Sequence, residues 1–158
     1  MHHHPEWKGR SAMTALREKH ETELRAHIDK VAAGIEAKDI EALRRLYTPD
    51  VVSFDVEPPL RHVGIAAKLN NWRNVFTFFE EVTYEVREPA FTVSDEVAYG
   101  HFFGRLSGTL RNGTATSGMW VRATVCFRRI DGEWLIAHDQ VSVPFDISTG
   151  MGVADLTP

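Results

Sequence analysis

The sequence contains one cysteine, Cys126, among its 158 residues, so no disulfide can form within the chain. A lone cysteine agrees with a reducing, cytoplasmic location. No apolar stretch approaches the roughly 20 residues that a membrane-spanning helix needs. The net charge of -4 comes without a long basic run, so neither nucleic acid nor an anionic membrane surface is an expected partner.

Signatures of metal, phosphate and serine chemistry are missing as well. Cys126 has no partner cysteine, and the chain has neither a glycine-rich phosphate loop nor a glycine-framed serine. The histidines beyond the first twelve residues follow no zinc-binding spacing; they are His20, His27, His62, His101 and His138. We therefore expect no metal ion and no cofactor.

The N-terminus carries three consecutive histidines, His2, His3 and His4, followed by polar residues. A secretory signal peptide would need an apolar segment there. Consecutive histidines on a polar terminus are typical of a purification tag, and the alternative, a metal site, is disfavoured. We interpret residues 1–13 as a leader, residues 14–145 as one domain and residues 146–158 as a C-terminal tail.

Apolar spacing predicts three helices in the first half of the chain. A stripe at spacings of four, three and four indicates a helix over 14–37; its members are Leu24, Ile28, Val31 and Ile35. Asp39 can cap a second helix over 39–47, in which Tyr47 continues the apolar face. A third helix is expected over 65–80, where large apolar side chains recur at helical spacing: Ile65, Leu69, Trp72, Phe76 and Phe79.

From residue 82 the apolar period changes to two, which indicates strands. Long strands are expected over 82–93, 96–110, 115–130 and 133–143, and a short one over 51–54. Pro89 predicts a bulge or an edge position, and Asp131-Gly132 predicts a tight hairpin turn. Helices followed by antiparallel strands indicate an α+β fold, with three N-terminal helices packed on one face of a curved sheet and an apolar pocket between them.

Two passages resemble a known superfamily. Residues 37–55, AKDIEALRRLYTPDVVSFD, are similar to the passage from second helix to first strand in ketosteroid-isomerase-like, or nuclear-transport-factor-2-like (NTF2-like), proteins. Residues 127–142, FRRIDGEWLIAHDQVS, resemble the last hairpin of the SnoaL-like branch. The resemblance covers roughly residues 14–145. It implies a conical half-barrel sheet around a pocket, in a fold shared by isomerases, dehydratases, epoxide hydrolases, cyclases and binding proteins.

Asp55 is the first catalytic candidate. The resemblance puts it where ketosteroid isomerases carry their general base. Proton abstraction needs a carboxylate in a dry pocket, and Asp55 lies between Phe54 and Val56; the alternative is a solvated aspartate at a strand end. The same resemblance puts Val31 and Val125 where the isomerases carry their oxyanion-hole donors, which argues against steroid isomerisation by that mechanism.

His101 and His138 are the other catalytic candidates. His101 shares one strand face with Tyr99, and the resemblance implies a role for it because dehydratases of the superfamily use histidines from the sheet. His138 could shuttle protons with Asp55. The alternatives are a surface or dimer-interface position for His101 and, for His138, a hydrogen-bonded network that fixes the end of the sheet.

The ligand-binding candidates are aromatic and polar residues of the third helix and the sheet: Trp72, Phe76, Tyr99, Trp120, Arg122 and Gln140. Trp120 and Arg122 alternate with more apolar residues, which favours an outward Arg122 that meets solvent or a partner subunit. The opposite assignment makes Arg122 an anchor for a carboxylate or phenolate in the pocket. Trp72, Phe76 and Phe79 are residue types that more often form a core, but we expect one of the three at the pocket mouth.

Two functions from different classes are consistent with these features. The first is a cofactor-free acid-base enzyme of isomerase, dehydratase or cyclase type, acting on a hydrophobic, ring-bearing small molecule. The second is a binding protein that holds such a molecule without catalysis. A homodimer is expected through the outer face of the sheet, because aromatic and arginine residues are enriched at interfaces.

Overall fold

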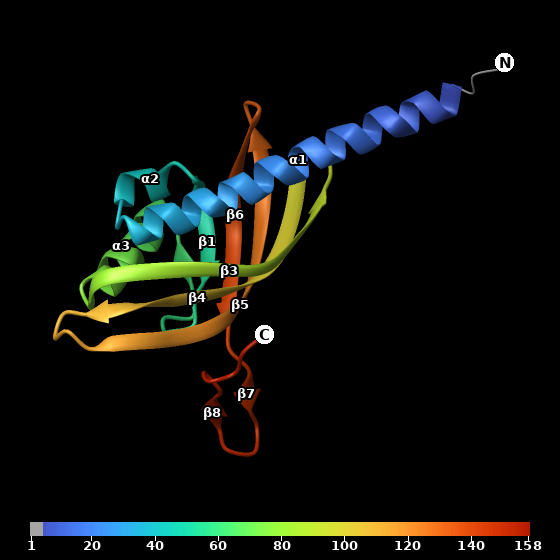
Figure 1. Ribbon diagram of the computed structural model, residues 1–158. Coiled ribbons are helices and arrows are strands. Elements are labelled where there is room, and N and C mark those ends of the chain that lie inside the picture. Colours follow the sequence, from blue (N-terminus) through green and yellow to red (C-terminus); the bar gives the residue numbers. More distant parts are fainter. Residues whose placement is uncertain (1–4) are drawn as a thin grey trace.

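The computed structural model describes residues 5–158, with side chains from residue 12 onward. Three helices, α1 (Pro5–Glu36), α2 (Ile40–Arg44) and α3 (Ile65–Phe76), pack on one side of a curved sheet (Figure 1). Helix α1 crosses the sheet, and its N-terminal end projects beyond it. No helix in this described range is long and apolar enough to cross a bilayer.

Six strands form the main sheet: β1 (Tyr47–Phe54), β2 (His62–Val63), β3 (Phe79–Val93), β4 (Val97–Leu110), β5 (Ala115–Ile130) and β6 (Glu133–Ser142). Their order across the sheet is β2-β1-β6-β5-β4-β3. Strands β1 and β6 are parallel, and the other neighbours are antiparallel. The predicted α+β class with a mostly antiparallel sheet is confirmed. The sheet stays open, because β2 and β3 are edges and do not pair with each other.

The hydrophobic core lies between the helices and the inner face of the sheet. The apolar stripe of α1 is buried along its length, because its spacing keeps all four members on one side of the helix: Leu24, Ile28, Val31 and Ile35. On the sheet, alternate residues point inward, such as Phe102 on β4 and Val125 on β5. This parity decides which side chains can reach a cavity under the sheet.

Helix α1 begins at Pro5 rather than at residue 14. Proline suits the first turn of a helix, and the sequence has no other proline before the end of α1. Side chains at residues 12–19 are exposed, so this part of α1 adds little to the core. Residues 1–4 of the predicted leader lie outside the described residues.

The other two helices end earlier than predicted. Helix α2 stops at Arg44, and Tyr47 opens β1 opposite Ile136 of β6. The strand pairing outweighs the helical spacing that suggested a longer helix. Helix α3 stops at Phe76, and Phe79 is the first residue of β3.

Local signals account for the caps and turns. Asp39 caps α2, since its Oδ1 accepts a backbone N–H of the first turn at 3.0 Å. Asp131 and Gly132 both have positive φ, 51° and 80°, as a two-residue hairpin turn requires. Strand β3 is an edge strand whose register shifts around Pro89, so the predicted irregularity is confirmed.

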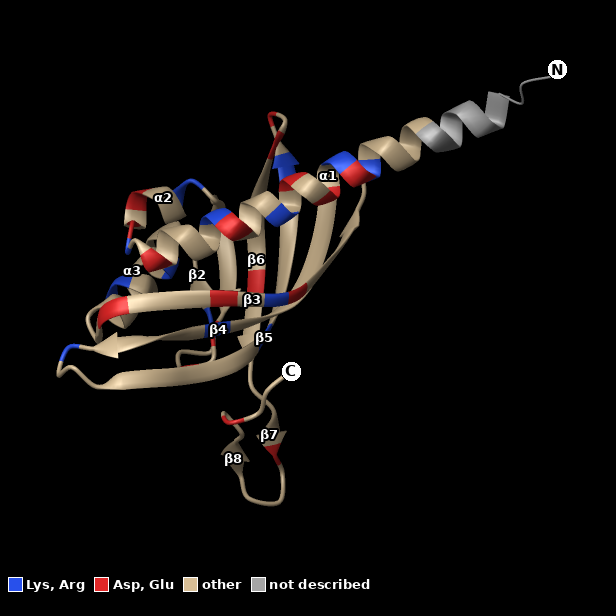
Figure 2. Ribbon diagram, in the orientation of Figure 1, with Lys and Arg blue, Asp and Glu red and all other residues tan. Residues whose placement is uncertain are grey.

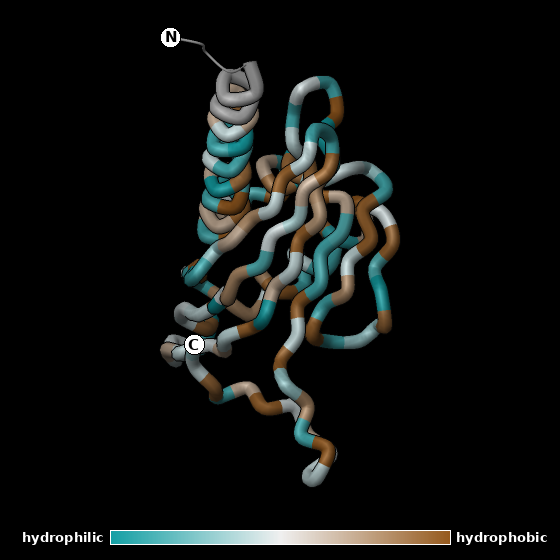
Figure 3. The backbone as a smooth tube through the Cα atoms, turned by 90° about the vertical axis from the view of Figure 1, so that its right-hand side faces the viewer, coloured by the Kyte–Doolittle hydropathy of each residue, from teal (hydrophilic) through white to brown (hydrophobic). Residues whose placement is uncertain are grey.

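The C-terminal tail holds a hairpin where we expected a loop. Strand β7 (Phe145–Asp146) pairs with β8 (Met151–Gly152). Among the described strands these two pair only with each other. Figures 1 and 3 show the hairpin projecting beyond the end of β6, away from the helices.

Candidate active site

A cavity of about 660 Å³ lies between the inner face of the sheet, α1 and α3. This volume is typical of small-molecule sites. Most of its wall is apolar and comes from the α1 stripe and from alternate residues of β4 and β5: Ile28, Val31, Ile35, Phe102, Leu106, Val121, Ala123 and Val125. The polar part of the wall comes from β1, β2, β6 and α3: Tyr47, Asp55, His62, Lys68, Asn71 and Asp139.

Asp55 lines the cavity directly after β1, with 15% of its side chain exposed. Its Oδ2 accepts a hydrogen bond from Asn71 Nδ2 at 2.8 Å. Its Oδ1 lies 3.7 Å from Lys68 Nζ. Lys68 and Asn71 are three residues apart on α3, so one face of that helix positions both of them. The carboxylate is thus held from one side at the edge of an apolar space.

His62, on β2, is a further neighbour of the Asp55 carboxylate. Its Nε2 lies 3.3 Å from Asp55 Oδ2, but the two groups are not aligned for a hydrogen bond. Nε2 is buried and has no hydrogen-bond partner among the described residues. A buried polar atom without a partner is uncommon, and a ligand in the cavity could supply one.

Lys68 is buried, and its ammonium is the centre of a polar network. Nζ donates to Ser53 Oγ at 2.9 Å and to Asp139 Oδ2 at 2.8 Å, while Ser53 Oγ donates to Asp139 Oδ1. Ser53 and Asp139 face each other across β1 and β6, so the parallel strand pairing brings them together. Burial lowers the pKa of Lys68, but the charges around it, Asp139 foremost, raise that pKa above its ordinary value. The lysine is therefore a fixed cation between two carboxylates.

Two tyrosines complete the polar wall. Burial raises the pKa of Tyr47 to about 12, although the nearby Lys68 opposes this shift. Burial also raises the pKa of the Tyr84 hydroxyl. That hydroxyl lies against Gly104, where a β-carbon would collide with it. Both phenols are protonated at neutral pH and can donate a hydrogen bond to a ligand.

Most of the other predicted site residues lie on the outer face of the sheet. Phe102 and Ala123 are buried, which shows that even-numbered residues of β4 and odd-numbered residues of β5 face inward here. Residues of the opposite parity point away from the cavity, and none of them lines it: Tyr99, His101, Trp120, Arg122, His138 and Gln140. The structure therefore separates His101 and His138 from Asp55, and we leave both out of the proposed site.

The outer residues near the end of β6 make structural contacts. His138 Nδ1 bonds to the Val52 carbonyl at 2.6 Å, and its ring packs edge-on against Phe54. Arg122 Nε donates to Ser142 Oγ at 3.2 Å. These contacts agree with the alternative of a network that fixes the end of the sheet.

The two aromatic candidates on α3 differ in position. Trp72 lines the cavity, and its indole N–H has no hydrogen-bond partner among the described residues. Phe76 is buried in the core, where its ring stacks on Trp72 with the centroids 5.6 Å apart. Trp72 can therefore contact a ligand, and Phe76 supports it from behind.

Sequence reasoning missed the network around Lys68. The signal was present, because Lys68 interrupts the apolar stripe of α3 at the position before Leu69. Asp139 likewise lies between Ile136 and Val141, the two apolar residues of β6 that line the cavity. A charged residue at an inward position needs a partner, and each of these two residues is the other's partner.

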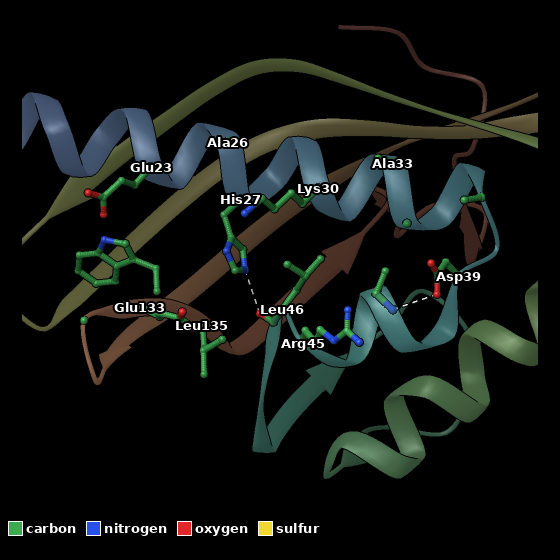
Figure 4. A pocket seen from close by; sticks show the side chains of 15 residues that line it. Glu23, Ala26, His27, Lys30, Ala33, Asp39, Arg45, Leu46, Glu133 and Leu135 are labelled. Carbon is green, nitrogen blue, oxygen red and sulfur yellow. Dashed lines mark hydrogen bonds between the residues drawn. The ribbon is translucent and has the colours of Figure 1, made fainter.

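A second hollow of about 750 Å³ lies outside the core, between α1, α2 and the start of β6 (Figure 4). Charges of both signs line it, including Glu23, Lys30 and Arg45. His27 points across it and donates from Nε2 to the Leu46 carbonyl at 2.9 Å. Burial lowers the pKa of His27, so its neutral ring connects α1 to Leu46, the residue before β1. This groove carries no acid-base pair comparable to that of the inner cavity.

Groups of three or more His, Cys, Asp or Glu side chains that could hold a metal ion are absent from the described residues. The chain thus presents its candidate chemistry as carboxylates, phenols, one lysine and one histidine around an apolar space.

Comparisons with solved structures support a common fold. The chain is similar to an NTF2-like protein of unknown function from Pseudomonas putida KT2440, with 26% identity, a TM-score of 0.80, and coverage of 89% of this chain and 98% of that one. It is similar to a candidate dehydratase of the NTF2-like family from Streptomyces avermitilis, with 16% identity, a TM-score of 0.72, and coverage of 82% and 99%.

A candidate scytalone dehydratase from Novosphingobium aromaticivorans is a third similar structure, with 14% identity, a TM-score of 0.67, and coverage of 77% and 82%. No curated protein matches the chain. The model of the SnoaL-like domain family matches residues 24–146, which is most of the chain. The chain therefore belongs to the SnoaL-like family, within the NTF2-like superfamily.

Proposed function

We propose that the protein is an acid-base enzyme that acts on a hydrophobic, ring-bearing small molecule, with Asp55 as the general base. The observation that carries this proposal is the position of the Asp55 carboxylate: it lines an apolar cavity and is oriented by Asn71. A base for carbon or water needs such a dry, oriented position. Isomerisation, dehydration and cyclisation all need a proton to be removed in this way.

The remaining polar groups have distinct roles in this proposal. Lys68 stays protonated, and its ammonium lies 3.7 Å from the Asp55 carboxylate, where its charge helps to hold that group in place. The phenols of Tyr84 and Tyr47, which both line the cavity, can donate to an oxygen that gains negative charge during the reaction. The His62 Nε2 atom is close enough to Asp55 to take part in a proton relay once a ligand aligns the two groups.

The substrate class follows from the cavity wall. The predominantly apolar wall of the cavity favours a ring system over a highly charged metabolite. Trp72 adds an aromatic face to that wall. Two of the similar structures are candidate dehydratases, so dehydration of a ring-bearing alcohol is the first reaction to test.

A non-catalytic binding protein is the second candidate function, and one observation favours it. Val31 and Val125 line the cavity and offer no hydrogen-bond donor. Lys68, Ser53 and Asp139 satisfy one another, so they do not need a ligand. In this case Asp55 and Asn71 would only orient a bound molecule.

The test is a screen of ring-bearing alcohols, ketones, enols and epoxides, followed by the substitution Asp55→Asn. This change keeps the shape of the side chain and removes the base. Turnover should fall by about 10²- to 10⁴-fold while ligand binding, followed by intrinsic tryptophan fluorescence, is retained. The matched control is Asp50→Asn on β1, whose side chain is exposed and pairs with Arg128 at the surface.

The outcomes separate the two functions. Normal turnover by Asp55→Asn would show that the base is elsewhere and would overturn the role of Asp55. Binding of apolar ligands without turnover of any of them would favour the binding protein.

We also propose that two copies associate through the outer face of the sheet. Trp120 lies there under two guanidinium groups, with Arg87 4.3 Å and Arg105 5.0 Å from its ring centroid. Tyr99 is half exposed on the same face. Aromatic and arginine side chains of this kind are enriched at interfaces. A monomer by light scattering at tens of micromolar would contradict this proposal.

A further inference from the structure

The C-terminal arm, defined as residues 143–158, has an unusual surface. It contains the β7–β8 hairpin, which pairs with no other strand that the structure describes. Large apolar side chains on the arm are each more than half exposed: Phe145, Ile147, Met151 and Leu156. Figure 3 shows these apolar stretches along a segment that extends away from the rest of the chain. Exposed apolar side chains in such a group mark an interaction surface.

The arm is nevertheless well ordered by its own hydrogen bonds. Asp146 Oδ1 accepts from both the backbone N–H and the hydroxyl of Ser148, at 2.9 and 2.7 Å. The backbone N–H of Gly150 donates to the Asp146 carbonyl, and that of Val153 donates to the Pro144 carbonyl. An isolated two-stranded hairpin is only marginally stable in water, so a preformed apolar hairpin is expected to pack on another surface.

Charge indicates which surface that is. The arm contains Asp146 and Asp155 and no lysine or arginine, so in Figure 2 it carries red and no blue. On the outer face of the main sheet arginines are in excess: Arg87 and Arg105 both pair with Glu85, and Arg122 lies on β5, two strands from Arg87. The exposed ring of Tyr99 adds apolar area to this face. The two surfaces are complementary in charge and in apolar character.

We propose that the C-terminal arm of one copy docks on the outer sheet face of a second copy. In a two-fold dimer the exchange is reciprocal, and each arm covers the face of the other subunit. The apolar side chains of the hairpin pack on the aromatic part of that face, and the two aspartates of the arm lie near its arginines. This inference rests on the homodimer proposed above and is independent of the ligand in the cavity.

The first experiment compares the full chain with a chain that ends at Ser142, by sedimentation velocity over a range of concentrations. The full chain should be a dimer at tens of micromolar, and the shortened chain should be a monomer with an unchanged circular dichroism spectrum. A monomeric full chain would overturn the homodimer and the arm together. A shortened chain that remains a dimer would overturn the arm alone.

A point substitution tests the arm without removing it. Ile147→Asp should raise the dimer dissociation constant by at least about tenfold, because it puts a charge where an apolar contact is needed. The matched control is Leu60→Asp, which changes an equally exposed apolar residue, 94% against 90%, in the loop after β1. An equal effect of both substitutions, or no effect of Ile147→Asp, would contradict the proposal.

A cross-link tests the location. Cys126 is the only cysteine and lies on the outer face, opposite Tyr99 of β4. The variant Ile147→Cys, treated with a short bismaleimide, should give a covalent dimer that is lost when Cys126→Ser is added. A cross-link within one chain, the absence of any cross-link, or a covalent dimer that survives Cys126→Ser would each place the arm elsewhere.

Discussion

The inner and outer faces of the sheet are built from alternate residues of the same strands, but they differ in the environment of their charged side chains. Those at the inner face are buried, and those at the outer face are partly exposed. On the inner face Asp139 of β6 is buried and accepts a hydrogen bond from Lys68, which reaches it from α3. On the outer face Arg87 and Arg105 share Glu85 and remain partly exposed to water. Removal of one inner charge leaves its partner buried without compensation, whereas water compensates for the loss of an outer one. The inner charges are thus coupled to the fold, and the outer charges are available to a partner.

The largest expected effect comes from removing the buried cation. Lys68→Met should lower the free energy of unfolding by about 3 to 5 kcal/mol, because Asp139 then remains buried without its counter-charge. Urea denaturation measures the change. Arg122→Met on the outer face is the control and should change stability by less than about 1 kcal/mol. A similar, small loss in both variants would contradict the contrast between the two faces.

A double variant sharpens the same contrast. Lys68→Met combined with Asp139→Leu removes the uncompensated carboxylate as well as the lysine. It should be more stable than Lys68→Met alone, since the two changes are coupled through one ion pair. Simple addition of the two single effects would show that the buried pair is not the cause.

Alkaline pH should act next most strongly, and on the inner face. The pKa of Tyr47 is raised in the folded state to about 12, so its contribution to stability is complete below the ordinary value of 10 and is lost as pH rises toward 12. The raised pKa of Lys68 has the same sign. The free energy of unfolding should fall by about 2 kcal/mol per such tyrosine between pH 10 and 12.

Urea titrations at pH 8 to 12 measure this fall. Tyr47→Phe should reduce the fall in the free energy of unfolding at high pH (the alkaline limb), because this variant lacks the phenol that titrates. Tyr99→Phe on the outer face is the matched control and should leave the limb unchanged, since that side chain is already half exposed. A limb that does not respond to Tyr47→Phe would show that another group titrates.

The smallest effect is expected at the exposed end of α1. Removal of residues 1–12 should change the free energy of unfolding by less than about 0.5 kcal/mol, because the neighbouring residues 12–19 are exposed and the helix end projects beyond the sheet. Thermal unfolding of the two chains measures the difference. A large fall in melting temperature would show that this end of α1 packs on the domain.

Local spacing predicted the fold well because the core depends on local periodicity. The α1 stripe from Leu24 to Ile35 and the alternation of β4 and β5 each identify a buried face within one element. The preferred outward assignment of Arg122 followed from the same alternation. Tyr47 was misassigned to a helix. Its strand pairing with Ile136 joins two distant parts of the sequence, and local spacing holds no information about such a contact.

The site was harder to predict for the same physical reason. Asp55 could be found by resemblance, but its neighbours depend on tertiary contacts. Asp139 meets Ser53 from 86 positions away, and Lys68 meets Asp139 from 71. His101 and His138 looked equally suitable as residue types, and only the parity set by the buried strands excludes them from the cavity. The sequence showed which residue types could take part in catalysis, but it did not show which of those side chains meet in the folded chain.

The parallel pairing of β1 with β6 has a consequence for how the chain matures. Contacts between segments far apart in sequence form slowly, because a long loop must close first. A nascent chain that has emerged from the ribosome only as far as β5 has no neighbour for β1 on that side, and Lys68 lacks Asp139, the carboxylate to which it donates a hydrogen bond. The nascent chain should therefore bind a ligand only after β6 has emerged. Ligand binding during synthesis would then show that the whole domain has been made.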